Sequence, residues 1–183
     1  MSNPLDFSGR AVLVTGGSRG IGRGIAEAFL SAGADVAVCG RKEPDELPSA
    51  NGKAALFLSA DVRDAEQLER LVDGVVERFG RLDVLNNNAG GAPFADAATA
   101  SPRFSEKVIQ LNLIAALHCA QQANRVMQTQ DEGGSIVNVA SVSGVRPSPG
   151  TAAYGAAKAG LINLSGTLAI EWAPKVRVTA LSA

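Results

Sequence analysis

Short apolar segments alternate with longer segments of helical periodicity along the whole chain. The apolar segments predict β-strands at residues 11–15, 35–39, 55–59, 84–86, 135–139 and 177–181. The periodic segments predict helices at 20–32, 65–79, 105–128 and 151–172, and residues 43–47 allow one further short helical turn. Strands that alternate with helices favour a parallel sheet with helices on both faces. The pattern therefore predicts a single doubly wound α/β domain over residues 1–183.

Two segments, at 90–102 and 143–150, show neither the apolar run typical of a buried strand nor helical periodicity, and are predicted to be loops. Each follows a predicted strand. Because the carboxyl ends of parallel strands meet at one edge of the sheet, where doubly wound folds bind ligands, we expect both loops to border the functional site.

The predicted helix at 151–172 is small or apolar almost all round, as is the first half of the helix at 105–128. A surface helix normally keeps a polar face, so a helix without one is covered on two sides. We expect the sheet to cover one side and a second copy of the chain to cover the other, in a homodimer or homotetramer.

Composition excludes several classes of partner. The formal net charge of −1 gives no reason to expect binding to nucleic acid or an anionic membrane. The chain shows no signal peptide and no apolar segment long enough to span a bilayer. Cys39 and Cys119 lie in a predicted strand and a predicted helix, so we interpret them as reduced core thiols of a cytoplasmic protein. His118 is interpreted as a packing residue, and no Cys/His cluster has metal-ligand spacing.

The only tyrosine of the chain lies four residues before a lysine, so Tyr154 and Lys158 share one face of a predicted helix. The pKa of a free phenol is near ~10, and a fixed ammonium one turn away favours the phenolate. Such a pair can act as general acid and base on an alcohol or a carbonyl. Ser141 lies thirteen positions upstream of the tyrosine.

A glycine-rich turn runs from Thr15 to Gly22, between the first predicted strand and the first predicted helix. Glycines at these places let backbone N–H groups and a helix N-terminus approach a pyrophosphate. The spacing is T-G-x-x-x-G-x-G, which differs from the G-x-G-x-x-G of the standard dinucleotide fingerprint.

Together these motifs resemble those of the short-chain dehydrogenase/reductase family, over essentially the whole chain and in the same order. The segment Asn87-Asn88-Ala89-Gly90 is similar to the family's N-N-A-G segment after the fourth strand. The resemblance implies a Rossmann-like fold and a nicotinamide-dependent oxidoreductase, with 3-oxoacyl reductases among the similar members. It implies four catalytic residues, which are Asn112, Ser141, Tyr154 and Lys158. It implies a cofactor site formed by Gly16, Ser18, Arg19, Gly20, Ile21, Gly22, Arg41, Asp61, Val62, Asn88, Ala89, Gly90, Tyr154 and Lys158.

The resemblance also implies a role for each catalytic residue. Tyr154 would exchange a proton with the substrate oxygen, and Ser141 would donate a hydrogen bond to that oxygen. Lys158 would hold the ribose hydroxyls, and Asn112 would shape the helix that supports a proton-relay water. Asp61 would lie beside the adenine, with Val62 next to it.

The residues after the second strand indicate the preferred cofactor. An NAD-selective site places a carboxylate there to accept hydrogen bonds from the ribose. This chain has Gly40 and Arg41 instead, and Arg19 of the glycine-rich turn can reach the same place. Two guanidinium groups suit a phosphate dianion, so we predict that NADP(H) is preferred over NAD(H).

Two features depart from the family pattern. Asn86 stands where an apolar strand residue is usual, and we expect its buried amide to bond neighbouring backbone or to face the cofactor. The chain also stops after its sixth predicted strand, where a seventh strand and a substrate lid would follow. We therefore expect the native polypeptide to continue past Ala183.

The leading interpretation is an NADP(H)-dependent carbonyl reductase or alcohol dehydrogenase that acts on a 3-oxoacyl thioester or a free ketone. The alternative is a catalytically weak or inactive nucleotide-binding or scaffold module, because the substrate lid is absent. Enoyl reductases, another branch of the family, are disfavoured because their Tyr-to-Lys spacing is longer.

Overall fold

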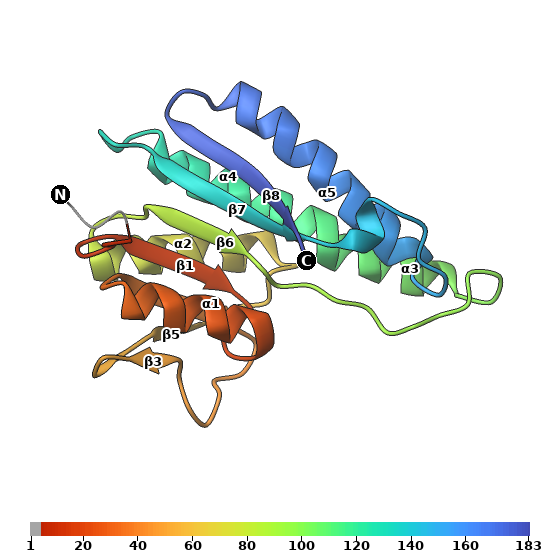
Figure 1. The fold of residues 1–183 in the computed structure, drawn as a ribbon, viewed down its shortest axis with the longest axis horizontal. Helices are drawn as coiled ribbons and strands as arrows, with labels where there is room; N and C mark the ends of the chain where they lie inside the picture. The colour runs from red at the N-terminus through yellow and green to blue at the C-terminus, as the bar shows by residue number, and fades with distance from the viewer. Residues whose placement is uncertain (1–4) are drawn as a thin grey trace.

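A computed structural model describes residues 5–183. Six parallel strands form one sheet in the order β5-β2-β1-β6-β7-β8. Figure 1 shows β1, β6, β7 and β8 running in the same direction. Their bounds are β1 Ala11–Thr15, β2 Asp35–Gly40, β5 Leu56–Ser59, β6 Val84–Asn87, β7 Gly134–Ala140 and β8 Val176–Ser182. All six predicted strands are present, each within one residue of its expected bounds. The strand order changes direction between β1 and β6, which places a ligand-binding switch point at their carboxyl ends.

The helices cover both faces of this sheet, with α1 on one face and α2, α4 and α5 on the other (Figure 1). Their bounds are α1 Gly20–Ser31, α2 Ala65–Phe79, α3 Pro102–Ile109, α4 Ala115–Met127 and α5 Ala152–Glu171. The helix expected at 105–128 begins earlier, at Pro102, because the Ser101 hydroxyl accepts a hydrogen bond from the Phe104 amide. Within residues 5–183 no helix has the length and apolar character needed to cross a membrane.

Alternate strand residues fill two apolar layers, as expected for strands buried on both faces. Val12 and Val14 of β1 pack toward α1, whereas Leu13 packs toward α2 and α4. Cys39 and Cys119 are free thiols of the second layer, and burial raises the pKa of Cys39 to about 11. The interpretation of both as core residues is confirmed.

Two local features between β2 and β5 differ from expectation. No helical turn forms at 43–47, because Pro48 disfavours a helical conformation of the residue before it. A two-stranded hairpin, β3 Ser49–Ala50 and β4 Lys53–Ala54, was not expected. Its turn is Asn51-Gly52, with φ of 52° and 77°, and this dipeptide is the sequence signal that should have predicted it.

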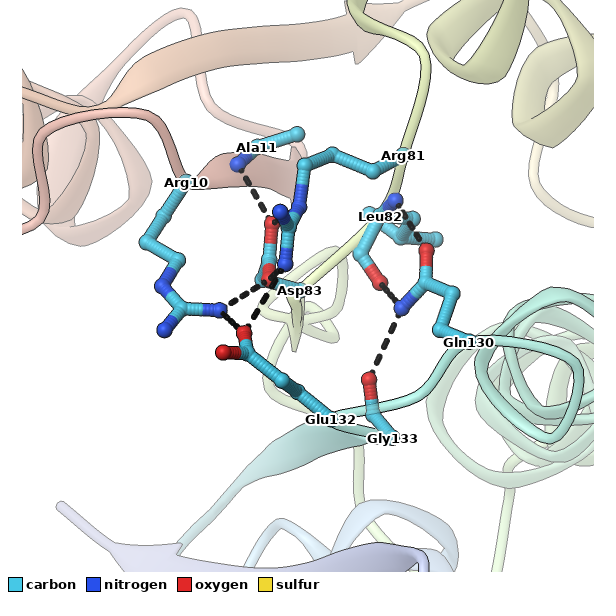
Figure 2. A network of polar contacts seen from close by, with 8 residues as sticks. All are labelled: Arg10, Ala11, Arg81, Leu82, Asp83, Gln130, Glu132 and Gly133. Atoms are coloured by element: carbon cyan, nitrogen blue, oxygen red, sulfur yellow. Dashed lines mark hydrogen bonds and ion pairs between the residues drawn. The ribbon is translucent and has the colours of Figure 1, made fainter.

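A cluster of paired charges joins the amino ends of β1, β6 and β7 (Figure 2). We call Arg10, Arg81, Asp83 and Glu132 the amino-edge cluster. Asp83 accepts hydrogen bonds from Arg81 at 2.6 and 2.8 Å, from Arg10 at 3.0 Å and from the Ala11 amide at 2.8 Å. Glu132 pairs with both arginines. Burial alone would raise the pKa of Asp83, but the bonds from Arg81, Ala11 and Arg10 outweigh it and hold this pKa below its usual value.

Gln130 extends this polar link from the end of α4 to the start of β6 (Figure 2). Its side chain accepts from the Leu82 amide at 2.8 Å and donates to the carbonyls of Leu82 and Gly133 at 2.9 and 2.8 Å. The amino edge of the sheet is therefore closed by hydrogen bonds between segments far apart in the sequence.

Candidate active site

The carboxyl ends of β1, β2, β6 and β7 border a cavity of about 1090 Å³. Every residue that the sequence assigned to the cofactor lines it, from the glycine-rich turn to Tyr154 and Lys158. The cavity is also lined by Lys42, Arg63 and Val139, which the sequence analysis did not single out. The volume slightly exceeds the roughly 300–1,000 Å³ of most small-molecule sites, which leaves room for a ligand as large as a dinucleotide.

The glycine-rich turn brings backbone close to backbone beneath this cavity. A Cβ on Gly22 would lie 2.4 Å from the Gly16 carbonyl oxygen, and one on Gly16, whose φ is +63°, would lie 3.1 Å from the Cα of Ala89. The contact at Gly22 leaves no space for a side chain, and at Gly16 the contact is tight and the positive φ disfavours any other residue. The nucleotide-binding interpretation of this turn thus agrees with its packing.

The N-terminus of α1 faces the cavity without a cap. Its N-cap residue, Arg19, makes no side-chain cap bond, and the first turn carries no acidic residue. Asp64 and Ser101, by contrast, cap α2 and α3 with their side chains. The free N–H groups of α1 therefore form a site suited to an anion, reinforced by the helix dipole.

Asn88 fixes the end of β6 against this turn. Its Nδ2 donates to the carbonyls of Thr15 and Gly16 at 3.0 and 3.2 Å. The Thr15 hydroxyl in turn accepts from the amides of Asn88 and Ala89 at 3.1 and 3.0 Å. These four bonds hold the N-N-A-G segment beside the glycine-rich turn.

Tyr154 and Lys158 lie in the first turns of α5, as their spacing predicts. The Lys158 Nζ is 5.7 Å from the centroid of the Tyr154 ring and donates to the Val139 carbonyl at 2.6 Å. The lysine is 4 % exposed, and burial lowers its pKa to about 8. No acidic residue pairs with it in the described part of the chain. The site thus holds a buried ammonium without a counter-ion next to a phenol.

Ser141 follows Ala140, a residue of the cavity wall, at the end of β7. Its hydroxyl oxygen accepts from the Ser143 amide at 3.3 Å and so caps the short 3-10 helix η2, Val142–Gly144. The hydroxyl proton remains free to be donated. Ser141 itself is 8 % exposed and does not line the large cavity.

Asn112 lies in a π-helical segment, η1 Gln110–Ile114, between α3 and α4. Its Nδ2 donates to the Val108 carbonyl, one helical turn before it, and to the Gly91 carbonyl, both at 2.9 Å. Its Oδ1 accepts from the Gly91 amide at 2.7 Å. The inserted side chain widens the helix and anchors the loop that follows β6. A Cβ on Gly90 would lie 2.7 Å from Asn112 Oδ1 and 3.4 Å from Lys158 Nζ, so both polar groups face the same small space.

A buried chain of hydrogen bonds connects β6 and β7 to α5. Asn87 donates to Asn138 Oδ1 at 2.9 Å, Asn138 donates to Ser165 Oγ at 2.9 Å, and Ser165 donates to the Leu161 carbonyl at 2.7 Å. Asn138 precedes Val139, the residue whose carbonyl holds Lys158. Strand β7 is therefore tied to α5 at two polar points.

Charges differ sharply along the cavity wall near β2. Arg19, Arg41 and Lys42 are exposed, and none of them makes an ion pair within residues 5–183. Asp61 does form one, with Arg63 at 2.5 Å. The hydrogen bonds from Arg63, together with the nearby charge of Arg41, lower the pKa of Asp61 to about 2 despite partial burial. This end of the cavity thus carries excess positive charge.

A second, smaller cavity of about 70 Å³ meets the large one at Tyr154, the residue that lines both. Its wall is uncharged and combines Ala92, Pro93 and Phe104 with the start of α5. The loops expected at 90–102 and 143–150 meet here, where the Ala95 amide donates to the Gly150 carbonyl at 3.0 Å.

The expectation for Asn86 is wrong. Its side chain is 6 % exposed, does not line the cavity, and leaves Oδ1 without a hydrogen-bond partner among residues 5–183. The cause is its register, because Asn86 lies between Val14 of β1 and Val137 of β7. The strand backbone already uses its own N–H and C=O groups there, and the neighbouring side chains are apolar.

Comparisons with known proteins agree with the dehydrogenase-like fold and cavity described above. The family model for short chain dehydrogenases matches residues 10–183. An uncharacterized oxidoreductase of Methylorubrum extorquens is 38 % identical over 183 residues, which cover 96 % of this chain and 73 % of the relative. A 3-oxoacyl-[acyl-carrier-protein] reductase of Synechocystis is 34 % identical over 183 residues, with coverage of 96 % and 74 %. The crystal structure of a short chain dehydrogenase from Mycobacterium smegmatis superposes with a TM-score of 0.92 at 33 % identity, covering 100 % of this chain and 79 % of that one.

The chain therefore belongs to the short-chain dehydrogenase family. It is an oxidoreductase of the NAD(P)-dependent class, built on a Rossmann-like α/β fold.

Proposed function

We propose that this chain is an NADP(H)-dependent reductase of carbonyl compounds, or in reverse a dehydrogenase of secondary alcohols. The observation that carries the proposal is the meeting of Tyr154, Lys158 and an uncapped glycine-rich turn in one cavity. The cofactor supplies the hydride when bound. Residues 1–183 would act as one cofactor-binding domain.

The residues present suit a nicotinamide dinucleotide. The free N–H groups at the start of α1 would hold the pyrophosphate, and the close backbone contacts of Gly16 and Gly22 would let it approach. Lys158 would donate to the ribose hydroxyls, since its Nζ is presented to the cavity by the Val139 carbonyl. Asn88 and Ala89 would flank the nicotinamide.

Each catalytic side chain would have a distinct task in proton transfer. Tyr154 would donate a proton to the substrate oxygen during reduction and accept it during oxidation. Lys158, 5.7 Å from the ring centroid, would stabilise negative charge on the phenol oxygen. Ser141 would donate its free hydroxyl proton to the substrate oxygen, and Asn112 would keep the loop at Gly91 in position.

The preference for NADP(H) rests on charge. Arg19, Arg41 and Lys42 have no carboxylate partner in the described residues, and Gly40 offers no carboxylate to a ribose hydroxyl. An additional phosphate dianion would gain charge-assisted hydrogen bonds from these cations. NAD(H) lacks that phosphate and would leave them solvated.

The substrate would place its carbonyl at Tyr154 and its substituent in the small uncharged cavity next to it. Both a 3-oxoacyl thioester and a free ketone have apolar groups next to the carbonyl that suit this wall. The Synechocystis relative is a 3-oxoacyl-[acyl-carrier-protein] reductase, which favours the first of these two classes.

We further propose that copies of the chain associate, as a homodimer or homotetramer, through α5 and the helical segment at 105–128. The outer face of α5 exposes small residues such as Ala156, Ala159 and Gly166, together with Ile170, which is 82 % exposed. A flat face of small residues lets two helices pack closely. Light scattering on a size-exclusion column would report the mass, and a monomer at micromolar concentration would contradict this assembly.

The reaction itself can be tested by following NADPH absorbance with acetoacetyl thioesters and with simple aliphatic and aromatic ketones. The proposal expects ketone-dependent oxidation of NADPH that is abolished in Tyr154→Phe. Binding of NADPH without turnover of any substrate would favour the alternative, a nucleotide-binding module without catalysis.

A further inference from the structure

The small cavity next to Tyr154 has a wall built mostly of methyl groups. Among its lining residues are Ala92, Ala95, Ala97, Ala100, Ala152 and Ala153. The large side chains of the lining are those of Phe104 and Tyr154, and none of the described residues that line it carries a charge. An uncharged wall of this kind suits an apolar group rather than a carboxylate or a phosphate.

The loop that forms one side of this cavity is anchored at three places. At its start, the Asn112 side chain bonds both the amide and the carbonyl of Gly91. In its middle, the Ala95 amide donates to the Gly150 carbonyl at 3.0 Å. At its end, the Ser101 hydroxyl caps α3. A loop held in this way keeps its alanines in place, so we expect the wall to resist expansion around a larger group.

Two further contacts stiffen the middle of the loop. The Phe94 ring lies against Gly150, where a Cβ would overlap the ring. The Asp96 side chain accepts a hydrogen bond from the Ala98 amide at 2.7 Å, which closes a turn around Ala97. The loop and the start of α5 therefore form one packed unit, and the volume between them is set by the side chains that line it.

The volume of this cavity, about 70 Å³, limits the group that can enter it. A methyl group is close in size to a water molecule, which occupies about 30 Å³ in the liquid, and a cavity that binds benzene has about 150 Å³. The small cavity therefore has room for about two carbon atoms with their hydrogens, and not for a six-membered ring. Because Tyr154 lines both cavities, this limit applies to the substituent on one side of a carbonyl held at the phenol oxygen.

We propose that this cavity is a size filter for the smaller substituent of the substrate carbonyl, so that the substrate is a methyl or ethyl ketone. The inference rests on the proposed function and narrows its substrate class. Among 3-oxoacyl thioesters the filter selects those with a methyl or ethyl group on the oxo carbon, and among free ketones it rejects those with two large substituents. Ala97 and Phe104 are specificity-determining residues, since each lines the cavity with a side chain that sets its volume.

The test measures kcat/KM with NADPH for two series of ketones in which one substituent is methyl, ethyl or cyclohexyl. The other substituent is constant and long, either the thioester side of a 3-oxoacyl N-acetylcysteamine or a phenylethyl group, so reversing the substrate in the site does not relieve the restriction. Cyclohexyl has the size of a benzene ring without conjugation to the carbonyl. In the series that wild-type protein reduces, kcat/KM for the cyclohexyl compound is expected to be at least about tenfold lower than for the methyl compound.

Two neighbouring alanines provide a matched pair of variants. Ala97 and Ala98 are both exposed loop residues, and of the two only Ala97 lines the cavity. Ala97→Leu should fill the cavity and lower the ethyl-to-methyl ratio of kcat/KM by at least about tenfold, because overpacking excludes the additional carbon. Ala98→Leu should keep the wild-type ratio. Phe104→Ala should enlarge the cavity and raise the cyclohexyl-to-methyl ratio by at least about tenfold.

The outcomes separate the inference from the proposed function. Wild-type protein that reduces the cyclohexyl compounds as well as the methyl compounds overturns the size filter and leaves the proposed function standing. Equal ethyl-to-methyl ratios in Ala97→Leu and Ala98→Leu, with wild-type melting temperatures in both, also overturn the filter. Wild-type protein that oxidises NADPH with none of the compounds contradicts the proposed function, and with it the inference that rests on it.

Discussion

The two edges of the sheet use charge in opposite ways. At the amino edge, Arg10 and Arg81 are paired with Asp83 and Glu132, and Asp83 accepts four hydrogen bonds (Figure 2). At the carboxyl edge, Arg19, Arg41 and Lys158 have no acidic partner in the described part of the chain. The charges of the amino edge are thus paired within the fold. The carboxyl edge instead carries unpaired cations and free helix N–H groups, which are suited to bind an anion.

This difference in charge pairing means that residues at the amino edge contribute to stability, whereas residues at the carboxyl edge contribute to function. A paired, partly buried cluster contributes to folding, and removing one member leaves the others unsatisfied. An unpaired cation next to a cavity contributes little to folding, and burying one as Lys158 is buried costs free energy. Substitutions at the two edges should therefore change different measured quantities.

The largest expected effect concerns the carboxyl edge. Tyr154→Phe removes only the phenol oxygen, which makes no hydrogen bond within residues 5–183 that would support the fold. Turnover is expected to fall by about 10²–10⁴-fold, the usual contribution of a general acid. The dissociation constant for NADPH and the melting temperature should both stay close to wild type. Near-normal turnover would remove Tyr154 from the mechanism.

Substitutions at the amino edge should instead change the free energy of unfolding. Asp83→Ala leaves the Ala11 amide and two arginines without their shared acceptor, and is expected to lower the free energy of unfolding by about 2–4 kcal/mol. Urea unfolding measures this change. Asp73→Ala breaks the exposed pair with Arg125 and should cost less than about 1 kcal/mol. Equal losses in the two variants would mean that the amino-edge cluster adds nothing beyond a surface ion pair.

The unpaired guanidinium groups should govern cofactor choice. Arg19→Ala combined with Arg41→Ala is expected to weaken NADPH by about tenfold or more per arginine and to change NADH little, because a charged hydrogen bond contributes about 1.5–3 kcal/mol. Stability should be unaffected, since neither side chain has an ion-pair partner to lose among residues 5–183. Arg78→Ala, on α2 and outside the cavity lining, is the control. Parallel weakening of the two cofactors would show that these residues do not contact the additional phosphate.

The smallest expected effect is a pH dependence from Lys158. Burial lowers its pKa from 10.5 to about 8 in the folded protein, so between these values the unfolded chain binds more protons. The free energy of unfolding should therefore rise with pH in this window, by about 1–2 kcal/mol from pH 8 to 9.5. Lys158→Met should lack that rise in urea titrations. The same slope in both proteins would assign the pH dependence to another group.

Structural features that contiguous residues specify could be predicted from the sequence, whereas features that depend on distant segments could not. The strands were predicted within one residue because apolar segments bounded by polar ones define them. The residues assigned to the cofactor line one cavity because the glycine-rich turn and the N-N-A-G segment are contiguous motifs that the parallel sheet brings to one edge; their contact with a cofactor stays a prediction. The hairpin at Asn51-Gly52 had a local signal that was overlooked.

Other features depend on contacts between distant segments and left no local signal. The π-helical segment at Asn112 forms because its side chain bonds Gly91, on a loop that no periodicity places there. The hydrogen bond from Lys158 to Val139 depends on how α5 crosses β7. The isolated amide of Asn86 follows from its register between two valines, a pairing that becomes visible only in the assembled sheet.

The most direct test of this account is a pair of titrations of the wild-type protein with NADPH and NADH at low ionic strength. If the cations of the carboxyl edge bind the additional phosphate of NADPH, the protein should bind NADPH at least tenfold more tightly than NADH. This preference should decrease as added salt screens the charges. Equal dissociation constants, or tighter binding of NADH, would contradict the account.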